Sequence, residues 1–228
     1  MTALSSDFAA SLEPLAIPQT RQVLMKLYTS VGPNPHVVHM FMAEKGIELP
    51  MQQLDVRGGE TRRAPYMAEV NRRGQSPALE LDDGQYLCEI TAICEYLDEK
   101  YPEPALIGTN AEERAETRMW VRRIDLTFCE PVASGYRYSD GYEVFKDRIR
   151  VLPEAAEGLK AIARDSLAWL DGEMEGKTYL CGDRLTLADV LLYCFVDFGN
   201  NRGQPLDPDN KTLSAWFDRM ASRPSAAK

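Results

Sequence analysis

The stretch GQSPALELDDGQYLCEITAICEYL, residues 74–97, predicts a β-hairpin that runs directly into a helix. Pro77 cannot donate a hydrogen bond to a sheet, so it marks the start of the first strand. Asp83 and Gly84 predict the hairpin turn, because glycine adopts the positive φ angle that tight turns need. Apolar residues then recur at helical spacing. Glu89 falls in the first turn of this helix, where backbone N–H groups have no partner within the helix, and taken alone it is a helix cap.

The residues before the hairpin predict an alternation of strands and helices. Residues 23–28 form a short apolar run of strand length, and residues 29–35 form a loop dense in Gly, Pro and Asn. A helix follows, then a second strand at 49–56 and a short helix at 65–70. With the hairpin and its helix, this order predicts a thioredoxin-like α/β domain. The sequence contains no glycine-rich motif that would support a dinucleotide or nucleoside triphosphate site.

The first helix has a clear beginning and end in the sequence. Asn34 is predicted as its N-cap with Pro35 at the first helical position, and Lys45 and Gly46 predict its end. A helix N-terminus also attracts a thiolate or a carboxylate. Asn34 can therefore cap the helix, serve a ligand, or do both.

The chain after residue 101 predicts an all-helical domain. A long amphipathic helix spans 111–138 and should be kinked by Pro131, and further helices are expected at 153–175, after Thr186 and at 213–220. Thr186 and Asp189 form a capping box, to which we assign a structural role. The expected organisation is a flexible tail, the thioredoxin-like domain, a linker and the helical domain, at 1–22, 23–101, 102–110 and 111–228.

Composition excludes several classes of function. The chain has 228 residues and a formal net charge of −9, which argues against a surface that binds nucleic acid or an anionic membrane. Residues 1–22 lack the basic and apolar segments of a signal peptide, and Met25 is an alternative start. The five cysteines contain no Cys-x-x-Cys pair and predict buried free thiols. His36 and His39 are predicted to be packed or solvated, and no metal site is expected.

Four of these motifs, in this order, resemble the cytosolic glutathione S-transferases over about residues 24–222. They are the opening strand with its Gly-Pro-Asn-Pro loop, the hairpin that begins at Ser76-Pro77, the run Glu89-Ile90-Thr91-Ala92-Ile93, and the Thr-x-Ala-Asp capping box. The resemblance implies a thioredoxin-like N-terminal domain followed by a helical bundle. It also implies glutathione as co-substrate without a metal, an electrophilic small molecule as second substrate, a homodimer, and a cytoplasmic role in detoxification.

The resemblance also assigns residues to glutathione. Ser76-Pro77 is expected to be a cis peptide whose Ser76 backbone pairs with the cysteinyl backbone of glutathione. Glu89 and the N–H of Ile90 are expected to hold the γ-glutamyl group. Ile90 stands where the family usually has Ser, and Thr91 is a candidate for the missing hydroxyl. The glycyl carboxylate is expected to meet Gln75 and three arginines, Arg62, Arg63 and Arg72.

The resemblance offers two candidates for the group that activates the sulfur. A free thiol with a pKa near 8.5 is mostly protonated at neutral pH, and each unit of lowering takes about 1.4 kcal/mol. The family usually provides Tyr, Ser or Cys in the first loop, whereas this chain resembles fungal and proteobacterial members that lack the usual residue. The candidate catalytic residues are Ser30 and Asn34, because a hydroxyl and an amide can both donate to a thiolate.

The aromatic residues of the helical domain allow two interpretations. Tyr136, Tyr138 and Trp120 line the pocket for the second substrate, or they form an ordinary aromatic cluster that covers the helical core. Three functions therefore remain from the sequence. The first is a transferase, the second a glutathione-binding or scaffold protein without turnover, and the third a glutathione-dependent disulfide or peroxide reductase. The absence of a cysteine in the first loop counts against a cysteine-dependent reductase.

Overall fold

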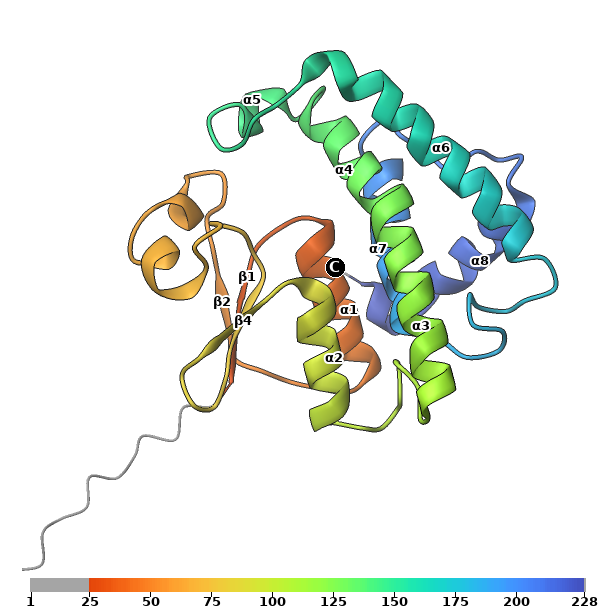
Figure 1. Ribbon diagram of the computed structural model, residues 1–228, viewed down its shortest axis with the longest axis horizontal. Helices are drawn as coiled ribbons and strands as arrows, with labels where there is room; N and C mark the ends of the chain where they lie inside the picture. Colours follow the sequence, from red (N-terminus) through yellow and green to blue (C-terminus); the bar gives the residue numbers. More distant parts are fainter. Residues whose placement is uncertain (1–24, 228) are drawn as a thin grey trace, which may run out of the picture.

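The computed structural model describes residues 25–227, and the expected tail at 1–22 lies outside them. An α/β domain is followed by a helical domain, and helices of both domains pack against each other (Figure 1). The elements of the α/β domain are β1 (Lys26–Thr29), α1 (Pro33–Glu44), β2 (Met51–Gln53), β3 (Ala78–Glu80), β4 (Tyr86–Cys88) and α2 (Ile90–Lys100). Short turns of helix at Glu60–Arg62 and Tyr66–Val70 lie between β2 and β3.

The sheet has four strands in the order β2-β1-β3-β4. β1 runs parallel to β2 and antiparallel to β3, so Leu27 lies opposite both Met51 and Leu79. β3 and β4 form the hairpin expected from the sequence, and Gly84 at its turn has a φ of 83°. The thioredoxin-like order of strands and helices that the sequence predicts is confirmed.

Side chains that alternate along β1 build two cores, one on each face of the sheet. Leu27 is fully buried against α1 and α2 with Phe41 and Ile93, in the large core that continues into the helical domain. Tyr28 points to the opposite face, where it packs with Tyr66 and other residues beneath the short helix at 66–70. The sheet is therefore covered on both faces, and the candidate site lies at the ends of its strands.

The helical domain contains α3 (Ala111–Ile124), α4 (Glu130–Arg137), α5 (Tyr142–Phe145), α6 (Ala156–Glu173), α7 (Leu187–Asn200) and α8 (Lys211–Ala221). α7 is buried on nearly all sides and packs against both α1 and α3. The expected break near Pro131 is present as a π-helical turn at Asp125–Cys129. Its cause is local, because the Pro131 ring clashes with the carbonyl four residues earlier. No helix in the described range is both long and apolar enough to cross a membrane.

Two predicted features of the helix ends have different outcomes. The capping box is confirmed, since the backbone N–H of Thr186 donates to Asp189 Oδ2 at 3.0 Å. The prediction that Asn34 is the N-cap of the first helix is wrong. The helix starts two residues earlier than predicted, at Pro33, with Gly32 as its N-cap at a φ of 128°. Only glycine adopts that backbone conformation readily, so Gly32 and Pro33 set the start of the helix.

Candidate functional site

The candidate site lies along one edge of the sheet. β1, β2 and β4 all end at this edge, and β3 begins there, because β1 is parallel to β2 and β3 is antiparallel to both of its neighbours. The strand order therefore places four segments side by side: the arginine-containing loop after β2, then Ser30 after β1, Ser76 before β3, and Glu89 after β4. Residues far apart in the sequence meet here in a single row.

Two hydroxyl groups meet in the middle of this row. Ser30 Oγ lies 2.5 Å from Ser76 Oγ, and the Ser30 side chain is buried at 7% exposure. The Ser76–Pro77 peptide bond is cis, as the family resemblance implies. Of the two candidate catalytic residues, Ser30 is thus joined to the cis-proline segment. Asn34 lies half-buried in the first turn of α1, and its side chain has no hydrogen bond to residues 25–227.

His39 supports the segment that carries Ser30. Its Nε2 lies 2.8 Å from Thr29 Oγ1, at the end of β1 and directly before Ser30. Burial lowers the pKa of the His39 imidazole below its ordinary value, so the ring is neutral at neutral pH. The sequence placed His39 only on a helix face, and this contact depends on how α1 packs on the sheet.

Glu89 is the only non-glycine residue with a positive φ angle in the described range, at 72°. It is the N-cap of α2, its side chain is exposed, and Ile90 and Thr91 begin the helix half-buried. An acidic residue held in an unfavourable backbone conformation is a feature that clusters at binding sites. The backbone N–H groups of the first turn are available to a ligand next to its carboxylate.

Asp125 is a second acidic residue near this end of the row, and no pattern in the sequence indicates that it belongs to the site. It lies half-buried in the π-helical turn between α3 and α4. Burial, and after it the charge of Glu130, raises the pKa of the Asp125 carboxyl, and the nearby charge of Glu89 adds to the rise. The helical domain thus contributes a carboxylate beside the Glu89 end, where a cationic group of a ligand would be favoured.

Gln75 and Arg62 lie on the other side of the row from Glu89. The Gln75 carbonyl accepts hydrogen bonds from Tyr66 Oη at 2.7 Å and Asn71 Nδ2 at 3.0 Å, while its side chain accepts from Arg73 Nε at 3.3 Å. Arg62 Nη1 donates to the Arg73 carbonyl at 3.0 Å. Burial lowers the pKa of Arg62, and the charges of Arg148 and Arg73 lower it further.

The other two arginines expected at the glycyl carboxylate are placed differently. Arg63 donates to the Gly58 carbonyl within its own loop. Arg72 is exposed. The structure therefore brings Arg62 to the Gln75 end of the row and shows no such arrangement for Arg63 or Arg72.

The three aromatic candidates separate into two locations. Tyr136 lies in the last turn of α4 and packs edge-on against Phe145 and Phe198, and Tyr138 follows the helix, half-buried. Trp120 is only 4% exposed and packs near the Trp169 ring inside the helical domain. The structure therefore does not bring Trp120 together with the two tyrosines.

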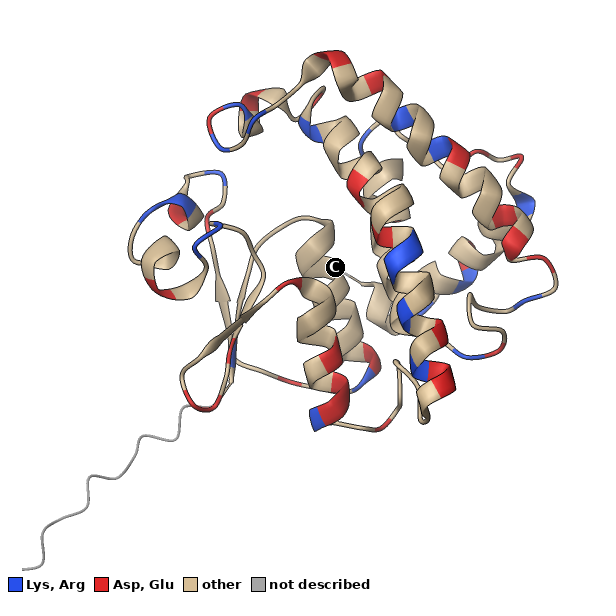
Figure 2. Cartoon of the chain, viewed as in Figure 1, with Lys and Arg blue, Asp and Glu red and all other residues tan. Residues whose placement is uncertain are grey.

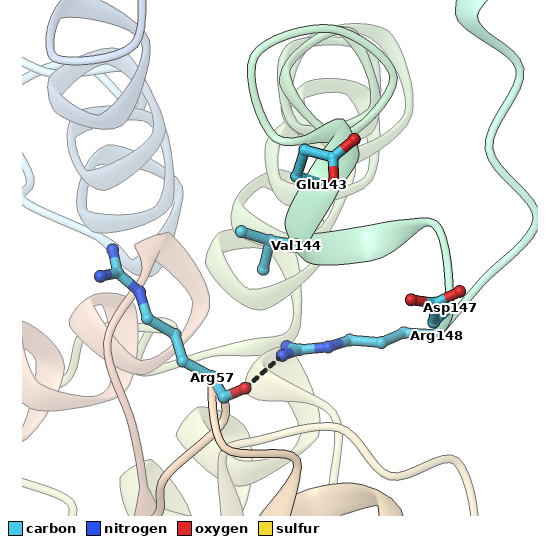
Figure 3. Close-up of a pocket in the computed structure, with 5 residues that line it drawn as sticks. All are labelled: Arg57, Glu143, Val144, Asp147 and Arg148. Carbon is cyan, nitrogen blue, oxygen red and sulfur yellow. Dashed lines mark hydrogen bonds between the residues drawn. The ribbon is translucent and has the colours of Figure 1, made fainter.

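A cavity of about 580 Å³ opens where the loop after β2 faces α5. Its lining comes from both domains: Arg57, Glu143, Val144, Asp147 and Arg148 (Figure 3). Arg148 Nη2 donates to the Arg57 carbonyl at 2.9 Å and so joins the helical domain to the loop. In the chain, α4 lies between the turn that contains Asp125 and this contact. In the described residues no group of three potential metal ligands is found.

The fold and the site define the class: a thioredoxin-like domain whose sheet edge, with a cis-proline and a strained acidic residue, faces a helical domain. Family models agree with this class. The glutathione S-transferase N-terminal domain matches residues 31–100, and the glutathione S-transferase C-terminal domain matches residues 149–224.

Individual relatives cover nearly the whole chain. A glutathione S-transferase of Pseudomonas putida is 31% identical, with 89% of this chain and 84% of the relative covered. Glutathione S-transferase 2 of Saccharomyces cerevisiae is 27% identical over 91% of this chain and 90% of its own length. A solved glutathione S-transferase domain-containing protein of Marinobacter aquaeolei superposes with a TM-score of 0.83 at 32% identity, covering 89% of this chain and 100% of that one. This chain belongs to the glutathione S-transferase family.

Proposed function

We propose that this protein binds glutathione along the sheet edge and activates its thiol for attack on an electrophilic small molecule. The proposal rests on the order of groups along the edge. Acidic groups, Glu89 and Asp125, lie at one end, the paired hydroxyls of Ser30 and Ser76 lie in the middle, and Arg62 lies toward the other end. Glutathione has the matching order, with an ammonium on its γ-glutamyl group, a central thiol and a terminal carboxylate.

The residues then have separate roles. Glu89 accepts from the γ-glutamyl ammonium, and the N–H groups of Ile90 and Thr91 face its carboxylate. The Ser76 backbone next to Pro77 pairs with the cysteinyl backbone. Gln75 and Arg62 meet the glycyl carboxylate.

The chemical step needs only a stabilised thiolate. The Ser30 hydroxyl donates a hydrogen bond to the sulfur and so favours the charged form, with Asn34 in the first turn of α1 as the second candidate donor. The thiol proton passes to solvent. The sulfur lone pair forms an S–C bond with the electrophilic carbon, and the leaving group departs with the electrons of the bond that breaks. Tyr136 and Tyr138, at the end of α4, are proposed to line the pocket of this second substrate.

The buried state of the cysteines favours the transferase over the reductase. Four of the five free cysteines are buried, and Cys88 is the half-buried exception. Cys88 Sγ donates to the Val70 carbonyl, and burial raises the pKa of its thiol. A cysteine with a raised pKa is a poor nucleophile at neutral pH. The reductase therefore finds no support in the cysteines.

Calorimetry with glutathione and a conjugation assay with 1-chloro-2,4-dinitrobenzene test the proposal together. Binding with a rate above the uncatalysed reaction supports the transferase. Binding without turnover for this and related electrophiles supports the alternative, a glutathione-binding protein. Absence of binding overturns the glutathione site itself.

We also propose that the protein is a cytoplasmic homodimer with a role in detoxification. Free cysteines are typical of reducing compartments. Met119 and Leu126 are exposed apolar residues seven positions apart along α3 and the turn that follows it, which is the spacing of a contact face. Sedimentation equilibrium of the wild type and of Leu126→Glu tests the dimer, which should dissociate more readily in the variant.

A further inference from the structure

The arginines around the cavity of Figure 3 carry more positive charge than glutathione alone would balance. Arg57 and Arg148 line the cavity, and the charges of Arg148 and Arg73 act on Arg62. Figure 2 shows basic segments both in the loop between β2 and β3 and in the region of α5 that faces it. Within residues 25–227 none of the four forms a salt bridge with a carboxylate. Burial lowers the pKa of Arg62, and the positive charges of Arg148 and Arg73 nearby lower it further. Such a cluster in a chain of net charge −9 favours an anion.

The two carboxylates of the cavity do not supply that balance. Glu143 Oε2 forms a salt bridge with Lys146 Nζ at 2.5 Å. The charge of Asp147 also acts on Lys146, because it contributes to the raised pKa of that ammonium. Glu143 is thus paired with Lys146, and within residues 25–227 neither Glu143 nor Asp147 forms a salt bridge with Arg57 or Arg148.

The Arg148 guanidinium is held by one hydrogen bond, and another of its N–H donors has no partner within residues 25–227. Its Nη2 donates to the Arg57 carbonyl at 2.9 Å, whereas its Nη1 is buried and has no hydrogen-bond partner in the described part of the chain. A buried donor without an acceptor is costly, so a site that leaves one open is prepared for an acceptor from outside. A guanidinium held from one side also loses little entropy when a carboxylate binds its remaining N–H groups.

The position of the pair assigns it to the second substrate. Gln75 is bonded to Arg73, which is in turn bonded to Arg62, so these arginines serve the glycyl end of glutathione. Arg57 and Arg148 instead line the cavity together with Val144 of α5, which offers an apolar wall, and Arg148 and Val144 belong to the helical domain. The Arg57 side chain extends away from the Arg148 guanidinium, so the two charges flank the cavity from different sides (Figure 3). A volume of about 580 Å³ is in the range of small-molecule sites.

We propose that Arg57 and Arg148 form a carboxylate-binding subsite, so that the preferred electrophiles of this protein carry a carboxylate group. The inference rests on the proposed function, because the subsite acts on the partner of glutathione.

Product mimics test the subsite without requiring turnover. Glutathione S-alkylated with a graded series of ω-carboxyalkyl chains is compared by calorimetry with matched compounds in which an isopropyl group replaces the carboxylate. At the best chain length the carboxylate should bind about tenfold more tightly than its isostere, as expected for a charge-assisted pair. Equal affinities at every chain length would overturn the subsite. Failure of both series to bind would instead overturn the glutathione site on which it rests.

Three variants locate the effect. Arg148→Met should reduce the carboxylate preference to within about twofold. Arg57→Met should do the same while leaving the backbone carbonyl that Arg148 holds, so it separates charge from the interdomain contact. Arg150→Met removes an equal charge from an exposed position two residues away and should leave the preference unchanged. Equal loss in all three variants would show only a general field effect and would contradict the assignment.

Discussion

Lys45→Met should destabilise the protein severely, because Lys45 is a fully buried cation at the end of α1. Its side chain is 0% exposed, and its Nζ donates to Asp98 Oδ1 at 2.7 Å and to the Pro104 carbonyl at 2.5 Å. Asp98 also accepts from the backbone N–H groups of Leu106 and Ile107, at 3.0 and 3.3 Å. The pair therefore fixes the segment between the two domains to α1 and α2.

The magnitude follows from the carboxylate that remains. Methionine fills the space of the lysine stem but leaves Asp98 charged, buried and without its cation, which typically costs about 3–5 kcal/mol. Total stabilities of about 5–15 kcal/mol make this a large fraction of the whole. Lys45→Met combined with Asp98→Asn removes both charges and keeps an acceptor for one of the two backbone donors. The double variant should therefore be less destabilised than the sum of the single variants by at least about 1 kcal/mol.

Urea unfolding followed by circular dichroism measures the free energy of unfolding of the wild type, of the two single variants and of the double variant. The midpoints should shift while the slope with denaturant stays constant. A cost below about 1 kcal/mol for Lys45→Met would show that this pair is as weak as a surface salt bridge. Strict additivity of the two changes would likewise refute the reasoning.

Three further predictions concern the site and the helix cap. Glu89→Gln should weaken glutathione binding by about tenfold in calorimetry, because the charge on the carboxylate is lost. The control Glu99→Gln, on the exposed side of α2, should leave binding unchanged. Equal effects of the two variants would contradict the proposed contact between Glu89 and the γ-glutamyl group. His39 resists protonation in the folded state because burial lowers its pKa. The unfolded state therefore binds more protons than the folded state below pH 6.5, so the free energy of unfolding should fall as pH drops through that value. His39→Gln should remove this dependence, and an identical pH profile in the variant would contradict the role of His39. Thr186→Ala should lower the unfolding free energy by about 1–2 kcal/mol without changing glutathione affinity, and a change in affinity would show that the capping box is not purely structural.

Local signals explain why the fold could be predicted. Pro77, Gly84 and the Thr186 capping box each act through backbone geometry within a few residues, so their effects are visible in the sequence. The prediction for Asn34 failed for the same kind of reason. Asparagine is a favoured N-cap, but Gly32 and Pro33 together specify a start two residues earlier, and their backbone constraint is the stronger one.

The missed parts of the site depend on contacts between distant segments. Arg148 reaches the Arg57 carbonyl across 91 positions of the chain. Asp125 comes near Glu89 only because a π-helical turn of the other domain faces the start of α2. Trp120 fits a pocket wall by residue type, yet helix packing buries it beside Trp169. Residue type and spacing do not encode such distances.

The central claim is that the edge at Ser30 stabilises the thiolate of bound glutathione. The most direct test is a pH titration of the ultraviolet thiolate absorbance of glutathione bound to the wild type and to Ser30→Ala. In the wild type the thiol should titrate about 1–2 pKa units below its ordinary value of about 8.5, and in Ser30→Ala most of that lowering should be lost. A bound thiol that titrates like free glutathione in the wild type, or equally low in both proteins, would contradict the account.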